Sequence, residues 1–212
     1  MHNSLEKQKY PGSAFLKFLI YLCASLTFLV LIFLIAYILI NGIPHINLDL
    51  FALKYTSDNA SVIPALINTV VMTLLSLLLA VPIGIFSAIF LVEYAKRGNK
   101  LVEIVRMTTE TLQGIPSIIY GLFGMLFFVN RLGWGFSIIS GAFTLAIMIL
   151  PLIMRTTEEA LKSVPDLYRE GSFGLGAGKL RTVFKIVLPA AMPGILAGII
   201  LAIGRIVGET AA

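Results

Sequence analysis

The stretch "EGSFGLGAGKLRTVFKIVLP", residues 170–189, places four glycines within eight residues and a lysine directly after them. Such a segment is a candidate for a loop that wraps nucleotide phosphates, for which the motif is G-x-x-x-x-G-K-[ST]. Aligning Gly178 and Lys179 with that motif requires a glycine at position 173 and a hydroxyl residue at position 180, where the chain has Phe173 and Leu180. The preceding "VPDLYRE" is also not the buried strand that such a loop follows. The glycines therefore need another explanation.

The composition of the whole chain is that of a membrane protein. Hydrophobic residues make up 58% of the 212 residues, charged residues make up 13%, and the mean hydropathy is +0.95. An apolar run of about 20 residues crosses the hydrocarbon core as a helix, because a helix satisfies its backbone hydrogen bonds internally. We therefore predict an all-α integral membrane protein, a polytopic helical bundle. Five spans are predicted, at residues 18–40, 60–92, 111–130, 132–154 and 186–204.

The positive charges lie mostly on one side of the predicted spans. Of the 16 Lys and Arg residues, thirteen precede the first span or lie in the loops after the second and fourth spans, whereas the opposite side has only Lys54 and Arg131. Because cytoplasmic loops carry an excess of Lys and Arg, this distribution predicts a cytoplasmic N-terminus. The net charge of +5 then requires no nucleic acid partner. The first span is longer than the apolar region of a secretory signal, which predicts a retained anchor.

The two predicted cytoplasmic loops have helical patterns. Residues 93–110 carry opposite charges at spacings of three and four, which predicts a solvated helix with no chemical role. In the second loop, Thr156 and Glu159 fit a capping box that would start a short helix, and Pro165 with Asp166 offers another start. In the last span, small residues recur every four positions, which predicts close packing against another helix. These small residues are Ala190, Gly194, Gly198 and Ala202.

The opening stretch matches a different motif, E-A-A-x3-G-x9-I-x-L-P, in spacing across all twenty positions. In this respect the chain resembles the ABC-type import permeases, whose EAA loop has this pattern. Gly171 and Ser172 stand where the family usually has two alanines, which would loosen the helix without changing its register. In the family, a short coupling helix projects from the membrane and seats in a cleft on a separate ATPase subunit. The resemblance implies this ATPase-coupling role for Glu170, Gly176, Ala177, Leu188 and Pro189.

Three further segments narrow the resemblance: "GIPSIIYGLFG" at 114–124, "RTTEEALKSVPDLYREGS" at 155–172 and "GRIVGETAA" at 204–212. Together with the EAA loop they resemble the phosphate-specific ABC import permeases, and the last segment is closer to the PstA type than to the PstC type. The resemblance implies the ABC type I importer permease fold. Residues 1–59 would form an N-terminal segment, the first span and an external loop, and residues 60–212 a permease core that contains the coupling loop 155–189. Family members continue to a sixth span, so we expect the sequence to be truncated at its C-terminus.

The resemblance also implies what the chain transports and with which partners. It predicts a permease subunit of a phosphate importer in the bacterial inner membrane. The expected partners are a second permease subunit of the PstC type, a dimer of ATPase subunits, and a periplasmic or extracellular phosphate-binding protein. The chain itself would bind no cofactor, because ATP would be held and hydrolysed by the ATPase subunits.

Three polar residues in or near predicted spans are candidates for the substrate path. Arg205 and Glu209 are four residues apart at the far end of the last span, which predicts that they share one helix face. Ionisable residues at membrane depth usually face a water-filled path or a partner, and a guanidinium suits phosphate oxygens. Our hypothesis is that Arg205 contacts phosphate and Glu209 holds the arginine; alternatively, the pair marks a subunit interface. Ser117, at the helix start that Pro116 predicts, is a weaker candidate, because packing explains that segment equally well.

The sequence has no H-E-x-x-H or G-x-S-x-G motif and no metal-type spacing of Cys and His. We therefore predict a transporter subunit that is not an enzyme and has no metal site. Several alternatives stay open at this point. They are an ABC permease for molybdate or sulfate, an ATP-independent channel or secondary carrier, and a truncated, non-functional fragment.

Overall fold

The computed structural model describes residues 11–53, 61–96 and 98–209. These residues divide into two compact units, Met1–Ile63 and Pro64–Ala212. All the regular elements within the described residues are helices or short helical turns. The predicted all-α fold class is therefore confirmed.

The first unit contains one long apolar helix, α1 (Pro11–Gly42). Its candidate membrane-spanning part, Phe15–His45, has no share buried within the chain. A helix that is apolar on all sides fits a lipid environment, so the first predicted span is confirmed. Two short 3₁₀ turns follow, at Ile43–His45 and Leu48–Phe51. The Val62 amide donates to the Leu50 carbonyl of the second turn at 2.9 Å, which ties this turn to the start of α2.

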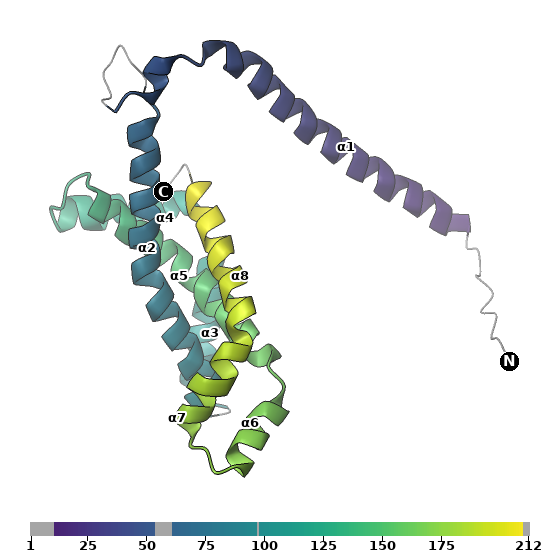
Figure 1. Ribbon diagram of the computed structural model, residues 1–212, viewed down its shortest axis with the longest axis vertical. Coiled ribbons are helices and arrows are strands. Elements are labelled where there is room, and N and C mark those ends of the chain that lie inside the picture. Colours follow the sequence, from purple (N-terminus) through teal and green to yellow (C-terminus); the bar gives the residue numbers. More distant parts are fainter. Residues whose placement is uncertain (1–10, 54–60, 97, 210–212) are drawn as a thin grey trace. The chain divides into compact units, whose positions relative to one another are not determined.

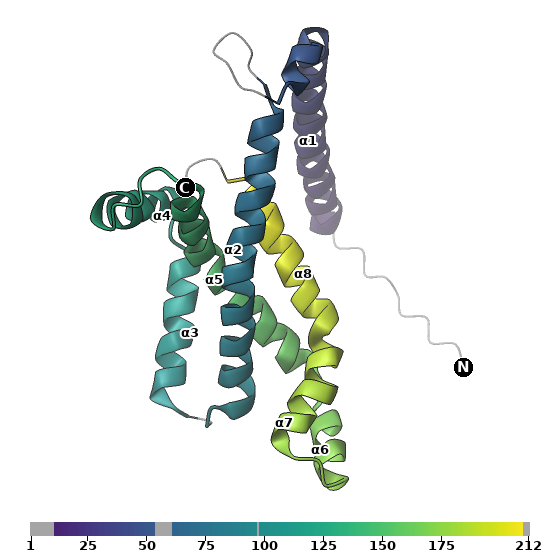
Figure 2. The same cartoon turned by 60° about the vertical axis from the view of Figure 1, so that its left-hand side comes forward.

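The second unit is built around three long helices, with α5 in contact with both α2 and α8 (Figures 1 and 2). Its helices are α2 (Ile63–Ile89), α3 (Lys100–Gln113), α4 (Ser117–Gly124), α5 (Ile138–Ser163), α6 (Asp166–Gly174), α7 (Lys179–Thr182) and α8 (Leu188–Val207). Wider π-type turns extend α2 and α4 and precede α8. These turns are Phe90–Tyr94, Met125–Arg131 and Val183–Val187. Both views place α6, α7 and the α2–α3 turn at the same end of this unit.

Four helical segments are long and apolar enough to cross a membrane, and a fifth span exists if the bent pair α3–α4 is counted as one. That pair is bent by 99°. The third predicted span, 111–130, is therefore not one continuous helix, because the helix breaks at Gly114–Pro116. The predicted start at Pro116 is confirmed, since Pro116 caps α4. Pro116 has no backbone N–H to donate and disfavours helical geometry in the residue before it, which explains the break.

The region after the fourth predicted span also differs from the prediction. Helix α5 runs without interruption through Thr156 to Ser163, so the predicted capping box at Thr156 was wrong. The Thr156 hydroxyl instead donates back to the Leu152 carbonyl at 3.0 Å, as Thr side chains inside helices do. The second predicted start is confirmed, because α6 begins at Asp166 directly after Pro165.

The most extensive packing in the second unit is between α5 and α8, and glycines make it possible. A Cβ atom at Gly194 would lie 2.7 Å from the Cβ of Ala160, and one at Gly198 would overlap the side chain of Thr156. Helices in lipid associate by van der Waals packing, so small residues at the contact let the two backbones approach. Helix α2 joins the same core, because the Ser76 hydroxyl donates to the Ala142 carbonyl of α5 at 3.1 Å.

This packing predicts opposite outcomes for two glycines of α8. Gly198→Ala should destabilise the protein by about 1–3 kcal/mol, because overpacking forces neighbouring side chains to move. Gly204→Ala is the matched control in the same helix, since no atom lies within 4 Å of the position that its Cβ would take. Thermal unfolding in detergent measures both. Equal stability of the two variants would contradict the close approach of α5 and α8.

Candidate functional site

The segment that carries the EAA-type motif folds into two short helices joined by a tight turn. It begins where Pro165 ends α5 and starts α6, and it returns through α7 into α8. Glu170, the first residue of the motif, lies in α6 and is exposed. Throughout, residues 164–182 are called the coupling segment.

Gly176 forms the turn that ends α6. Its φ is +80°, a left-handed conformation that side chains with a Cβ adopt only at a cost. The Gly176 amide donates to the Phe173 carbonyl at 2.9 Å, and the Ala177 amide donates to the Ser172 carbonyl at 3.1 Å. This pair of bonds is the Schellman motif, in which a left-handed glycine satisfies the last carbonyls of a helix. The spacing between Glu170 and Gly176 thus has a local structural reason.

Ser172, which departs from the usual alanine, forms a buried contact with α7. Its hydroxyl lies 2.8 Å from the Thr182 hydroxyl, and Thr182 in turn donates to the Gly178 carbonyl at 3.2 Å. Ser172 and Thr182 are only 4% and 1% exposed. Since the Thr182 proton goes to Gly178, Ser172 is the donor to Thr182. The departure from alanine therefore ties α6 to α7, and α6 stays helical across Gly171 and Ser172.

Several apolar side chains of the coupling segment point away from the rest of the chain. Leu167 is 76% exposed and Leu175 is 91% exposed, although both lie in a polar region of the sequence. Gly171 and Gly174 have no atom within 4 Å of their Cβ positions, so nothing in this chain requires their small size. An exposed apolar surface with vacant space beside it is typical of a site that another protein covers.

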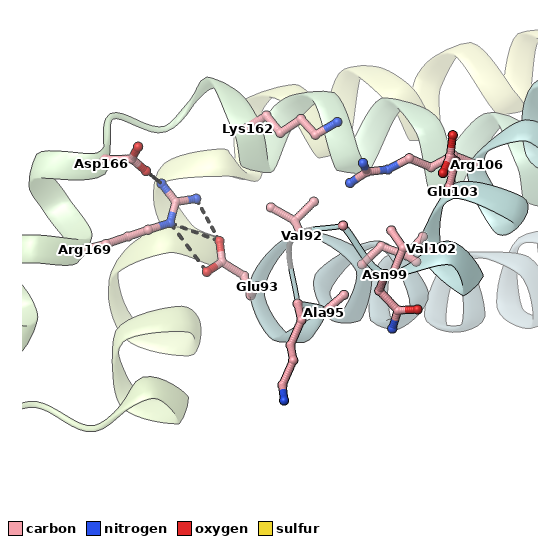
Figure 3. Close-up of a pocket in the computed structure, with 13 residues that line it drawn as sticks. Val92, Glu93, Ala95, Asn99, Val102, Glu103, Arg106, Lys162, Asp166 and Arg169 are labelled. Carbon is pink, nitrogen blue, oxygen red and sulfur yellow. Dashed lines mark hydrogen bonds and ion pairs between the residues drawn. The ribbon is translucent and has the colours of Figure 1, made fainter.

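Ion pairs hold the coupling segment against the end of α2 (Figure 3). Arg169, directly before Glu170, places its Nη2 2.7 Å and its Nε 3.1 Å from Oε1 of Glu93. The Arg169 and Glu93 side chains are 14% and 8% exposed, so this pair is largely shielded from water. Sequence reasoning missed it, because residues 93–110 were interpreted as a solvated helix with no role.

A second ion cluster joins α3 to α5 at the same end. Glu158 of α5 lies 2.6 Å from both Arg106 of α3 and Lys162 of α5, measured from its Oε1 to their Nε and Nζ atoms. The charged helix predicted within residues 93–110 is present as α3, which begins at Lys100. Its Arg106 forms an ion pair with Glu158 of α5 instead of facing only solvent. The charge spacing within residues 93–110 is a signal for helix, but not for this partner.

The two ion clusters border a pocket of 630 Å³ between α2, α3, α5 and α6 (Figure 3). Its lining mixes cations and carboxylates, and Arg169 and Glu93 within it already neutralise each other. Among the residues that the structure describes, no group of three His, Cys, Asp or Glu side chains is arranged to hold a metal ion. The ion pairs at the border of this pocket connect the helices that surround it.

Leu188 and Pro189 of the motif begin α8. Leu188 is half-buried and Pro189 is exposed, whereas the neighbouring Val187 is fully buried. Proline is tolerated in the first turn of a helix, because the missing N–H has no intrahelical partner there. The end of the motif therefore lies inside the continuous helical segment Lys179–Val207, which is the last candidate span.

The predicted path residues lie elsewhere in the second unit. Arg205 is half-buried in the last turn of α8, and α8 ends at Val207. Glu209 lies two residues beyond the end of α8, and its amide donates to the Ile206 carbonyl at 3.1 Å. The expected pairing of Glu209 with Arg205 stays a prediction. Ser117 is the half-buried first residue of α4. Tyr120, three residues later, belongs to the same buried core cluster as Ile206.

The helices, their apolar surfaces and the coupling segment together define a multi-pass helical membrane protein of the importer permease class. Residues 80–212 match the family described as binding-protein-dependent transport system inner membrane component. The chain belongs to this family, and so to a family of transport components rather than enzymes.

Three relatives show how far the similarity extends. The chain is 38% identical over 193 residues to the probable ABC transporter permease protein YqgI of Bacillus subtilis, covering 90% of this chain and 65% of that protein. It is 42% identical over 147 residues to the phosphate transport system permease protein PstA 1 of Mycobacterium tuberculosis, covering 69% and 48%. The chain is 37% identical over 174 residues to the PstA protein of Xylella fastidiosa, and this match covers 81% of this chain and 60% of that protein. The predicted resemblance to PstA-type permeases is confirmed, and the chain spans about half to two thirds of these relatives' lengths.

The Schellman turn predicts a contrast between two glycines of the coupling segment. Gly176→Ala should destabilise the turn by about 1–2 kcal/mol, the cost of a left-handed conformation for a residue with a Cβ. Gly174→Ala is the control, because Gly174 is helical and no atom lies within 4 Å of its Cβ position. Hydrogen exchange of the 171–178 amides measures the effect. Unchanged protection in Gly176→Ala would contradict the role given to this turn.

Proposed function

We propose that the chain is a permease subunit of an ATP-driven importer of inorganic phosphate. The observation that carries this proposal is the coupling segment. Its turn is built by Gly176, and its Leu167 and Leu175 side chains are exposed, as expected of a short helix that seats in another protein. A flexible loop without a partner would need neither the Schellman turn nor the buried Ser172–Thr182 contact.

The partners follow from the same surface and from the family. We propose that an ATPase dimer covers the coupling segment, that a second permease subunit of the PstC type completes the path, and that a phosphate-binding protein delivers the anion from outside. ATP would be bound and hydrolysed by the ATPase subunits. Closure of the ATPase pair would then move α6 and switch the path from outward to inward access.

The orientation in the membrane follows from the charges. The end of the second unit that holds α6 also holds Lys162, Arg106 and Arg169. These cations form ion pairs with the carboxylates of Glu158 and Glu93. Because cations are retained on the cytoplasmic side, we propose that this end faces the cytoplasm of a bacterial cell. For the N-terminus we propose the same side, because Lys7, Lys9 and Lys17 precede the first span in the sequence.

The choice of phosphate rests on the relatives and on Arg205. The PstA proteins of Mycobacterium tuberculosis and Xylella fastidiosa are named as phosphate transport permeases, at 42% and 37% identity. Arg205 offers a guanidinium fork that suits a tetrahedral oxyanion, at the end of α8 far from the coupling segment. Sulfate and molybdate are tetrahedral too, and competition against them decides the substrate.

The first prediction concerns the coupling surface. Leu167→Ser combined with Leu175→Ser should weaken capture of the ATPase subunits by roughly tenfold or more, since burial of each leucine contributes about 1.5–3 kcal/mol. Both side chains are exposed, so the chain itself should stay folded. Leu101→Ser with Ile104→Ser is the matched control, because these leucine and isoleucine side chains are 70% and 56% exposed on α3. Co-purification from membranes measures capture, and equal capture by both double variants would refute the proposed contact.

The second prediction concerns the anion. Membrane vesicles with the assembled complex should take up labelled phosphate, and excess sulfate or molybdate should not compete. Arg205→Ala should lower uptake at least tenfold with normal assembly, whereas Arg205→Lys, which keeps the charge but loses the fork, should retain part of it. Uptake by Arg205→Ala at the wild-type rate would show that the arginine only marks an interface.

A further inference from the structure

Two consecutive residues at the end of α2 contact the coupling segment at two separate places. Glu93 pairs with Arg169 in α6, one residue before the motif begins. Tyr94 lies under the Lys179 ammonium, which is 5.0 Å from the ring centroid, at the start of α7. The end of α2 thus holds both arms of the helix–turn–helix that carries the exposed leucines.

The Glu93–Arg169 contact also includes the end of α5. Besides Glu93, Arg169 donates from Nη2 to the Leu161 carbonyl at 2.9 Å and from Nη1 to the Val164 carbonyl at 2.8 Å. Leu161 lies in the last turn of α5 and Val164 is its C-cap, where carbonyls lack the usual intrahelical partner four residues on; the Leu161 carbonyl also accepts the Val164 amide at 3.4 Å. One guanidinium therefore joins three elements: α2, α5 and α6. We call this contact the Glu93–Arg169 clamp.

The backbone at the end of α2 is shaped for this contact. The Ala95 amide donates to the Phe90 carbonyl, five residues earlier, at 2.9 Å, so Phe90–Tyr94 form a π-type turn. One extra residue in a turn rotates the residues after it by about 100° relative to a regular helix, which has 3.6 residues per turn. The turn therefore changes the direction of Glu93 compared with a continuous α-helix.

The clamp supplies a link that the chain connectivity lacks. Helix α6 is joined directly to α5 and, through α7, to α8, but α2 lies more than seventy residues earlier and has no covalent connection to it. A charged carboxylate–guanidinium hydrogen bond is strong and directional, and separating it would leave the largely buried Glu93 carboxylate without its arginine. A movement of α6 would therefore pull on α2 through this pair.

We propose that Glu93 is a positioning residue of the transport cycle, and that the Glu93–Arg169 clamp stays closed while it transmits movement of α6 to α2. This inference rests on the proposed function, because it assumes that α6 is moved by ATPase subunits. Without the clamp, ATP hydrolysis would still move α6, α5 and α8, but α2 would lag behind.

The test compares Glu93→Gln with Glu103→Gln in the assembled complex, reconstituted in liposomes. Glu93→Gln keeps the side-chain shape but removes the charge, and Glu103 is an exposed carboxylate that lines the same pocket. Glu93→Gln should bind the ATPase subunits and hydrolyse ATP as the wild type does, while phosphate uptake per ATP falls roughly tenfold, the change expected for loss of a charged hydrogen bond. Glu103→Gln should match the wild type in both measurements.

A cross-link distinguishes transmission from simple stability. Cys23 is the chain's single cysteine, so Cys23→Ser gives a cysteine-free background. In that background, we would introduce Tyr94→Cys and Lys179→Cys and join the two cysteines with a short thiol-reactive cross-linker that contains a cleavable disulfide. The cross-link replaces the Tyr94–Lys179 contact covalently and leaves Arg169 intact. In the Glu93→Gln variant, the cross-link should raise phosphate uptake per ATP back toward the wild-type value. Reductive cleavage of the cross-link should abolish this recovery.

The outcomes separate the two proposals. A wild-type complex without ATP-dependent uptake would overturn the proposed function and the clamp's role with it. If the wild type transports phosphate but Glu93→Gln has the same uptake per ATP, the clamp alone is refuted. If the cross-link stops transport in a chain with native Glu93, the contact has to open during the cycle, which also refutes a clamp that stays closed.

Discussion

The close approach of α5 and α8 is the contact on which the rest of the second unit depends. At Gly194 and Gly198 the two helices leave no room for an additional methyl group. In lipid there is little hydrophobic gain from bringing two helices together, so this fit and its dispersion contacts must hold them. The coupling segment is the connection between these helices, and their contact therefore fixes the positions of its two ends.

The coupling segment uses polar contacts for its own shape and leaves its apolar side chains exposed. Gly176 satisfies the last carbonyls of α6, Ser172 binds Thr182, and Arg169 binds Glu93. This arrangement is the reverse of an ordinary surface helix, which buries its apolar face and exposes its polar one. Such a helix presents Leu167 and Leu175 without collapsing onto its own chain, which a docking element requires.

Sequence reasoning predicted what depends on local pattern and missed what depends on distant partners. The helical class, the first span and the start of α6 follow from apolar runs and from proline. The break at Gly114–Pro116 has a local cause, but its 99° bend depends on how α4 packs. The Thr156 capping box fits the pattern as well as many true caps, yet α5 continues because packing against α8 outweighs it. Glu93 and Arg169 are 76 residues apart, and no spacing rule within one helix relates them.

Helix α8 connects the two sites of the proposed function. Its twenty residues span about 30 Å at 1.5 Å per residue, with the coupling segment at one end and Arg205 in the last turn at the other. A small tilt at the first turn is therefore a displacement of several ångströms at Arg205. Pro193 lies inside α8 and removes one backbone hydrogen bond from it, and the π-type turn Val183–Val187 precedes it. Both are places where a helix bends at low cost. In the proposed cycle, the tight contact of α8 with α5 and the bendable turn before α8 would together determine how much of a movement of α6 reaches Arg205.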